Sequence, residues 1–206
     1  MKTAGNLFFN ASLICLFFFF TGITSVFGGI AGSAHDFSSQ GWSGGRICQV
    51  CHAPHTADSS AVDAPLWNHE ITTSTFTMYS SPSMVVQPES QPLGVTKLCL
   101  SCHDGTVAID SFADNWGSTY ISGTANLATD LSDDHPVSVR WRHQNQTPSC
   151  TNCHFTHGQM FSSELPFFSG FVECATCHDV HNTIALPKLL RKPLQQSEIC
   201  FYCHGK

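Results

Sequence analysis

Ten of the eleven cysteines form five pairs, and a histidine directly follows each pair. The five motifs are Cys48, Cys51 and His52; Cys99, Cys102 and His103; Cys150, Cys153 and His154; Cys174, Cys177 and His178; and Cys200, Cys203 and His204. Cys-x-x-Cys-His is the attachment signature of c-type haem: the two thiols form thioether bonds to the porphyrin, and the histidine ligates the iron. The sequence therefore predicts five covalently bound haem c groups.

Three other uses of paired cysteines explain this pattern less well. Structural zinc needs thiolates or imidazoles in sets of four, but it does not need a histidine after every pair. A disulfide scaffold suits a secreted chain with many cysteines, but it leaves the five histidines unexplained. A thioredoxin-like dithiol is a single motif in a βαβ setting. Covalent haem is the interpretation that uses every residue of the repeated motif.

Seven histidines outside the motifs are candidates for the second axial position of each iron. They are His35, His55, His69, His135, His143, His157 and His181. Five haems need at most five such ligands. His55, His157 and His181 each come three residues after a motif histidine. Such a side chain cannot easily fold back onto the same iron, so we expect it to ligate a neighbouring haem; otherwise it lies on the surface or binds a propionate.

Two further candidates have neighbours that suit a ligand. His69 ends the run PLWNH, whose leucine and tryptophan would pack on a porphyrin face. His135 follows Asp134, and we expect this acid to bind the second ring nitrogen and fix the tautomer. His143 follows Arg140 and Arg142 in the run RWRH and is assigned mainly to the haem propionates.

Residues 1–28 read as a secretory signal peptide. Lys2 is followed by an apolar stretch from Leu7 to Phe20 and then by small residues. A retained membrane anchor is the alternative, but the apolar core is short for a span. A lipoprotein modified at Cys15 is disfavoured, because Ile14 stands where a small residue is needed. We expect export and no stable membrane span after cleavage, with one domain at residues 29–206.

The composition limits both the fold and the partners. Charged residues make up only 12% of the chain, and the formal net charge is −6. The chain has no basic stripe, which excludes a nucleic-acid partner. With about 35 residues per haem, the polypeptide is too short to enclose each cofactor in its own apolar core. We expect a mostly irregular multihaem cytochrome c fold with short helices and few strands, in which the haem chain is the core.

Local patterns indicate where regular structure lies. Short helical turns are expected at the Cys-x-x-Cys-His motifs, which must wrap a haem edge. Residues 135–141 alternate like a strand. Residues 41–45 (GWSGG) are expected to form a flexible turn.

Several runs resemble the doubled-CxxCH multihaem cytochromes of metal- and sulfate-reducing prokaryotes. These runs are CHAPH, PLWNH, KLCLSCHDGT, DLSDDHPVS and CHDVH. More narrowly, they are similar to the OmcE-type cytochromes that polymerise into extracellular nanowires. Members of that type typically carry four haems, which correspond to the motifs at Cys48, Cys99, Cys174 and Cys200. The motif at Cys150 is an addition. The resemblance implies bis-histidine haems, a mostly coil fold and a close-packed haem chain.

Electron transfer is the predicted function, with a multihaem oxidoreductase enzyme as the alternative. An enzyme needs one iron with an open position, whereas the spare histidines suffice to close all five. Without methionine as an axial ligand, low potentials are expected. The expected partners are other redox proteins, minerals or extracellular acceptors, and copies of the chain itself. The expected location is extracellular or on the outer surface, with a soluble periplasmic carrier as the alternative.

His35 has a separate prediction because it lies near the expected new N-terminus. We hypothesise that it completes a haem of the next subunit, in a head-to-tail contact that propagates as a fibre. The alternatives are that it ligates a haem of its own chain or that it does neither.

Overall fold

The computed structural model describes residues 29–55, 57–58, 60, 63, 66–141 and 164–204. Several predictions lie outside these residues. They concern the signal peptide at 1–28, the motif Cys150, Cys153 and His154, and the spare histidines His143 and His157.

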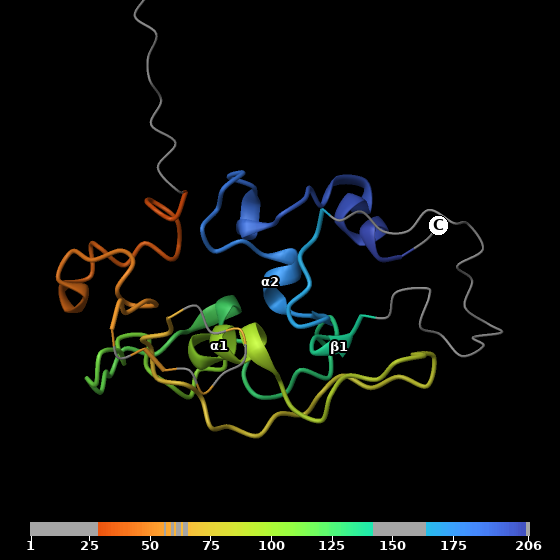
Figure 1. Ribbon diagram of the computed structural model, residues 1–206, viewed down its shortest axis with the longest axis horizontal. Helices are drawn as coiled ribbons and strands as arrows, with labels where there is room; N and C mark the ends of the chain where they lie inside the picture. The colour runs from red at the N-terminus through yellow and green to blue at the C-terminus, as the bar shows by residue number, and fades with distance from the viewer. Residues whose placement is uncertain are drawn as a thin grey trace, which may run out of the picture.

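Loops and turns dominate the described chain (Figure 1). Its α-helices are α1 (Gly94–His103) and α2 (Cys174–Cys177), and its 3₁₀-helices are η1 (Gly41–Ser43), η2 (Gly123–Ala125), η4 (Pro187–Leu189) and η5 (Gln195–Tyr202). The strands β1 (Val139–Arg140) and β2 (Phe171–Val172) pair antiparallel, with Val139 opposite Val172. The prediction of a mostly irregular fold with short helices and few strands is confirmed. The strand predicted over 135–141 is limited to two residues.

Helix α1 ends where its backbone turns left-handed. The Asp104 N–H donates to the Leu100 carbonyl at 2.9 Å, and Gly105 follows with φ +73°. Glycine adopts this conformation without a steric penalty. A side chain here would also clash, because a Cβ would lie 2.5 Å from the amide of Asn126. The helix therefore stops directly after its Cys-x-x-Cys-His motif.

Residues 41–45 form a short 3₁₀-turn followed by two left-handed glycines. Gly44 and Gly45 have φ values of 61° and 79°. The predicted turn is present and begins with η1.

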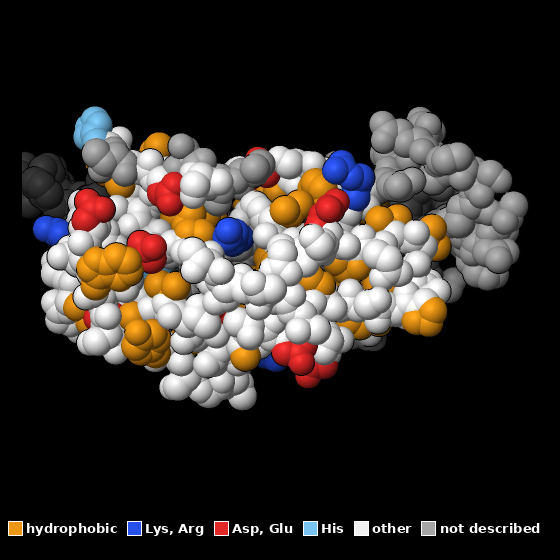
Figure 2. Space-filling view, turned by 90° about the horizontal axis from the view of Figure 1, so that it is seen from below, with side chains coloured by type: hydrophobic (Ala, Val, Ile, Leu, Met, Phe, Trp, Pro, Cys, Tyr) orange, Lys and Arg blue, Asp and Glu red, His pale blue; other side chains and the backbone are white. Residues whose placement is uncertain are grey.

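The apolar core of the protein part is small. Phe76, Leu100 and Leu131 form a buried cluster, against which Met78 and Val137 pack. Figure 2 shows hydrophobic side chains scattered over one face between uncharged ones, with few charged groups. The polypeptide thus buries little apolar surface of its own at any one point, as expected if the cofactors fill the interior.

Helices α1 and α2 lie side by side near the middle of the molecule (Figure 1). The backbone N–H of Cys174 donates to Thr96 Oγ1 at 3.1 Å, and the N–H of Thr96 donates to Glu173 Oε2 at 3.3 Å. These reciprocal bonds join the first turns of the two helices. They bring together two motifs that are far apart in the sequence.

The C-terminal part of the chain contains non-glycine residues in left-handed conformations. Lys188 and Leu189 both have φ 57°, and Gln196 and Ser197 have φ 51° and 61°. A side chain is sterically disfavoured there, so the surrounding structure must hold these residues in place.

Candidate haem sites

Each described motif forms one helical turn that gathers its three functional side chains. In the motifs at Cys48, Cys174 and Cys200, the histidine N–H donates to the carbonyl of the first cysteine at 2.9, 3.0 and 2.8 Å. The motif at Cys99 lies within helix α1. Residues three and four positions apart share a face of a helical turn. The two thiols and the imidazole are therefore placed to attach and ligate one haem.

Three motif histidines each face one spare histidine. The ring centroids of His52 and His181 are 6.2 Å apart, those of His103 and His35 are 5.9 Å apart, and those of His204 and His135 are 6.3 Å apart. Metal–imidazole bonds are about 2.0 Å long, as at zinc, so two imidazoles on opposite sides of one metal have centroids about 6 Å apart. All three separations fit a single iron between the rings.

Backbone carbonyls select the tautomer that an iron ligand needs. The Nδ1 atoms of His103, His135 and His178 lie 2.8, 3.0 and 2.9 Å from the carbonyl oxygens of Ala125, Pro136 and Lys188, respectively. A proton on Nδ1 that binds a carbonyl leaves the lone pair of Nε2 for a metal.

The expected tautomer partner of His135 differs in the structure. The carbonyl of Pro136 lies at its Nδ1, in the place predicted for the Asp134 carboxylate. A carbonyl of the adjacent residue is held close by the chain itself, whereas a side chain must lose rotamer freedom to take that position.

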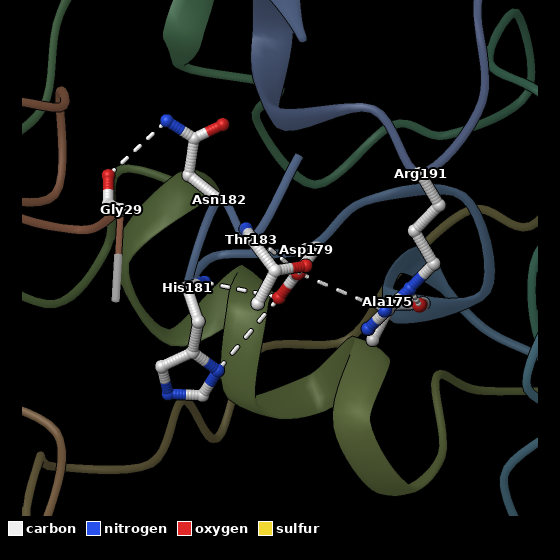
Figure 3. Close-up of polar contacts among 7 residues, drawn as sticks. All are labelled: Gly29, Ala175, Asp179, His181, Asn182, Thr183 and Arg191. Atoms are coloured by element: carbon white, nitrogen blue, oxygen red, sulfur yellow. Dashed lines mark hydrogen bonds and ion pairs between the residues drawn. The ribbon is translucent and has the colours of Figure 1, made fainter. Parts of the chain in front are cut away.

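His181 is held by a buried carboxylate (Figure 3). Asp179 is 5% exposed, and its Oδ1 accepts a hydrogen bond from the N–H of His181 at 3.1 Å and lies 3.7 Å from the ring Nδ1. Its Oδ2 accepts from Thr183 Oγ1 at 2.5 Å and lies 3.9 Å from Nη1 of Arg191. Despite its burial, the pKa of Asp179 is lowered, because Thr183, the His181 backbone and Arg191 stabilise the ionised form.

His35 is a half-buried imidazole beside His103 of its own chain. Burial, and then the neighbouring His103 and His178, lower the pKa of His35 to about 4. Its Nδ1 is buried without a hydrogen-bond partner among the described residues. Among the described residues, no carbonyl holds the Nδ1 of His35, in contrast to the Nδ1 atoms of His103 and His135.

His69 and His55 are placed differently from the three facing pairs. His69 is 2% exposed, and its Nδ1 and Nε2 lie 2.8 and 3.1 Å from the carbonyls of Glu70 and Ala108. Its Nε2 is also 3.4 Å from the sulfur of Cys102, so it lies directly beside a haem-attachment residue. His55 is exposed one turn after the first motif.

The described cysteines differ in exposure: Cys48 and Cys200 are exposed, and the others are partly buried. Burial raises the pKa of Cys51 to about 11 and that of Cys102 to about 12. The thiols of Cys99 and Cys174 shift each other across the α1–α2 contact, so the pKa of Cys99 is raised and the pKa of Cys174 is lowered. The surroundings of Cys51 and Cys102 therefore suit an uncharged thioether better than a thiolate.

A cavity of about 410 Å³ opens beside the first motif. His52, Trp67 and Trp116 are among the residues that line it. The indole Nε1 of Trp67 is buried and has no hydrogen-bond partner among the described residues. Polar side chains, among them Asp58, Asn68 and Glu70, also line the cavity, so its wall is mixed rather than apolar.

Two residues important to this geometry were not singled out by the sequence reasoning. Asp179 lies inside the run CHDVH, and an acid between two candidate ligands is a signal that could have been used. Glu173 precedes the fourth motif, but its burial depends on contacts with α1 that the sequence does not show.

Residues 165–206 match the family model of the doubled CXXCH motif. A search of the curated proteins finds no match. In the part of the chain that the structure describes, no helix is long and apolar enough to cross a membrane. The motif, the helical turns and the irregular fold support a multihaem c-type cytochrome, a class of haem-binding electron carriers that is typically exported.

Proposed function

We propose that this protein is an exported electron carrier with five covalent haems, each ligated by two histidines. The observation that carries the proposal is the set of three facing histidine pairs. In each pair, one imidazole belongs to a Cys-x-x-Cys-His motif and the other to a spare histidine. Chance packing of histidines would pair two motif rings, or two spare rings, as readily as one ring of each kind.

The ligand assignments follow these pairs. His181 would be the second ligand of the iron at His52, His35 of the iron at His103, and His135 of the iron at His204. His55, His69 and His157 remain the candidates for the irons of His178 and His154. If His69 ligates an iron, its ring must give up the contact with the carbonyl of Glu70 or with that of Ala108.

The protein's own residues would hold and insulate the cofactors. The cysteines would attach the haem edges, and the facing imidazoles would ligate the iron. Backbone carbonyls would hold the Nδ1 protons of His103, His135 and His178. The haem supplies a one-electron couple when bound. Since both axial ligands come from rigidly placed side chains, little rearranges when the oxidation state changes.

His181 also joins two neighbouring sites. It lies three residues after His178, yet its ring faces His52. The same short segment would therefore ligate two irons, which keeps the two haems close together. Short separations of this kind suit rapid transfer between cofactors.

Export and assembly complete the proposal. We assign residues 1–28 to a signal peptide and 29–206 to one pentahaem domain, with polymerisation into an extracellular filament suggested by the resemblance to OmcE-type subunits. His35 is assigned here to its own chain, so a subunit contact would use other residues. A soluble periplasmic carrier is the other outcome, and electron microscopy of secreted material separates the two.

The decisive experiment is a haem count on the mature protein. Its mass should equal that of the polypeptide plus five haems, and acid–acetone should not extract the haem. Reduced and oxidised samples should both be low-spin. Bound zinc in place of haem, or haem that acid–acetone removes, would overturn the proposal.

A further inference from the structure

Glu173 is a buried carboxylate at the contact between two haem-attachment helices. It is 2% exposed and caps the N-terminus of α2. Its Oε2 accepts hydrogen bonds from the N–H of Thr96 in α1 and from Ser138 Oγ, both at 3.3 Å. Three parts of the chain therefore converge on one acid.

The surroundings of Glu173 are polar but closed to water. Thr96, Ser138 and Thr176 are each 0% exposed. The N–H of Glu173 donates to Thr176 Oγ1 at 3.0 Å. Hydrogen bonds of this kind stabilise a buried charge only in part, because burial in a medium of low polarity disfavours the ionised form.

The balance of these effects favours the protonated acid more than water does. Burial raises the pKa of Glu173 above its ordinary value, and Asp63 raises it further, while the hydrogen bonds from Thr96 and Ser138 oppose the shift. The ionisable groups that face it from α1 and α2 include the thiols of Cys99 and Cys174. Once the two thiols are converted to thioethers, they no longer carry a proton that can titrate.

Glu173 also lies where two haem edges would meet. Cys174 is its direct neighbour, and the helices that carry Cys174 and Cys99 are in contact. The charge of Glu173 acts on both sulfurs. Haems attached at these two cysteines would thus have this carboxylate at their junction.

We propose that Glu173 is the proton acceptor of a redox-linked site, taking up one proton when an electron arrives at either adjoining haem. The inference rests on the proposed function. An external redox partner would supply the electron that reduces the haem iron from ferric to ferrous. A solvent proton converts the Glu173 carboxylate to the neutral acid. No bond to iron forms or breaks, and the charge added by the electron is balanced by the proton.

The sign of the pH effect follows from this coupling. The added electron raises the affinity of the acid for a proton, so the potentials of these two haems should fall as the pH rises. The potentials should fall with pH at pH values above the ordinary titration range of glutamate. The slope of potential against pH should correspond to at most one proton per electron.

The test is a spectroelectrochemical titration of the holoprotein at a series of pH values. Wild type should show pH-dependent potentials for two haems, and Glu173→Gln should show them independent of pH. The matched control is Glu89→Gln, which changes an exposed acid in the segment whose N–H binds the Ser138 carbonyl, and it should behave as wild type. Dependence that persists in Glu173→Gln, or its absence from wild type, would refute the inference.

A second variant and a second readout cover the case in which Glu173→Gln does not fold. Ser138→Ala removes one donor to the carboxylate and should move the pH-dependent window upward. Redox-difference infrared spectra of wild type should gain the carbonyl stretch of a protonated carboxyl on reduction. The inference would also be refuted if Ser138→Ala left the pH range of the potential change unaltered and no carbonyl band of a protonated carboxyl appeared on reduction. Failure to load haem or to reduce reversibly would count against the proposed function instead.

Discussion

The imidazole rings of His52 and His181 lie 6.2 Å apart and within 11° of parallel. One ring comes from the turn of the first motif, and the other from the loop after the fourth. The segment that carries His181 is fixed in turn by Asp179, which binds its backbone, and by Asn182, whose amide donates to the carbonyl of Gly29 at 3.1 Å. The N-terminal end of the described chain is thereby tied to the loop that carries His181.

Replacing His181 with Ala should open one iron. The iron held by His52 would lose its second imidazole, so a high-spin fraction should appear and carbon monoxide should bind to about one haem in five. Optical spectra of the reduced protein with carbon monoxide measure this. The matched control is Val180→Ala, which changes the exposed neighbouring residue and should leave all irons closed. A His181→Ala protein without a carbon-monoxide-binding fraction would contradict the assignment.

The angles between paired imidazole planes predict distinct electron paramagnetic resonance signals. His52 and His181 are 11° from parallel, whereas His135 and His204 are 75° apart. Parallel planes separate the two iron d orbitals that interact with the imidazoles, and perpendicular planes leave them nearly equal in energy. The oxidised protein should therefore show one rhombic low-spin signal and one with a much larger principal g value.

The variants identify the source of each signal. His181→Ala should remove the rhombic signal, and His135→Ala should remove the large-g signal. The ligand geometry would be wrong if both variants lost the same one.

Replacing Asp179 with Asn should raise the potential of the haem at Cys48. The carboxylate lies 3.7 Å from Nδ1 of His181, where its charge strengthens the imidazole as a donor and favours ferric iron. A redox titration should show one haem shifted upward and the others little changed. The lost hydrogen bonds should also cost about 1–2 kcal/mol of stability. Asp133→Asn, at an exposed acid, serves as the control; equal shifts in both variants would exclude a specific role for Asp179.

Replacing Leu131 with Ala should test how far the small apolar cluster matters beside the cofactors. Leu131 is 5% exposed and packs with Phe76 and Leu100. Removing three buried carbons should lower the free energy of unfolding by about 2–5 kcal/mol. Guanidinium unfolding of the holoprotein measures it, with Val85→Ala as a control at a side chain 71% exposed. Equal stability of the two variants would show that the cofactors alone hold this region.

The sequence was informative where chemistry repeats and uninformative where distant segments meet. The motifs identify the attachment residues and the local turn at each of them, because those depend on neighbours in the chain. That His181 faces a distant motif could be expected from its spacing from His178, but not that the motif is the one at His52. The pairing of His35 with His103 could not be predicted either, because it depends on the path of the glycine-rich segment that follows His35.

The same limit applies to the polar groups around the sites. The adjacent Asp134 was the predicted partner of the His135 ring nitrogen. In the structure the carbonyl of Pro136 lies at the Nδ1 of His135 instead. The burial of Glu173 results from the packing of α1 against α2. No pattern in the sequence predicts that these two helices are in contact.

The left-handed residues near the C-terminus bear on how the cell makes this protein. Lys188, Leu189, Gln196 and Ser197 hold conformations that each cost of order 1 kcal/mol or more, and the small apolar cluster offers little to offset them. A chain that has not received its cofactors should therefore stay open and be cleared by proteases. The amount of protein that accumulates would then report the supply of haem at the export site, so that maturation and quality control become a single step.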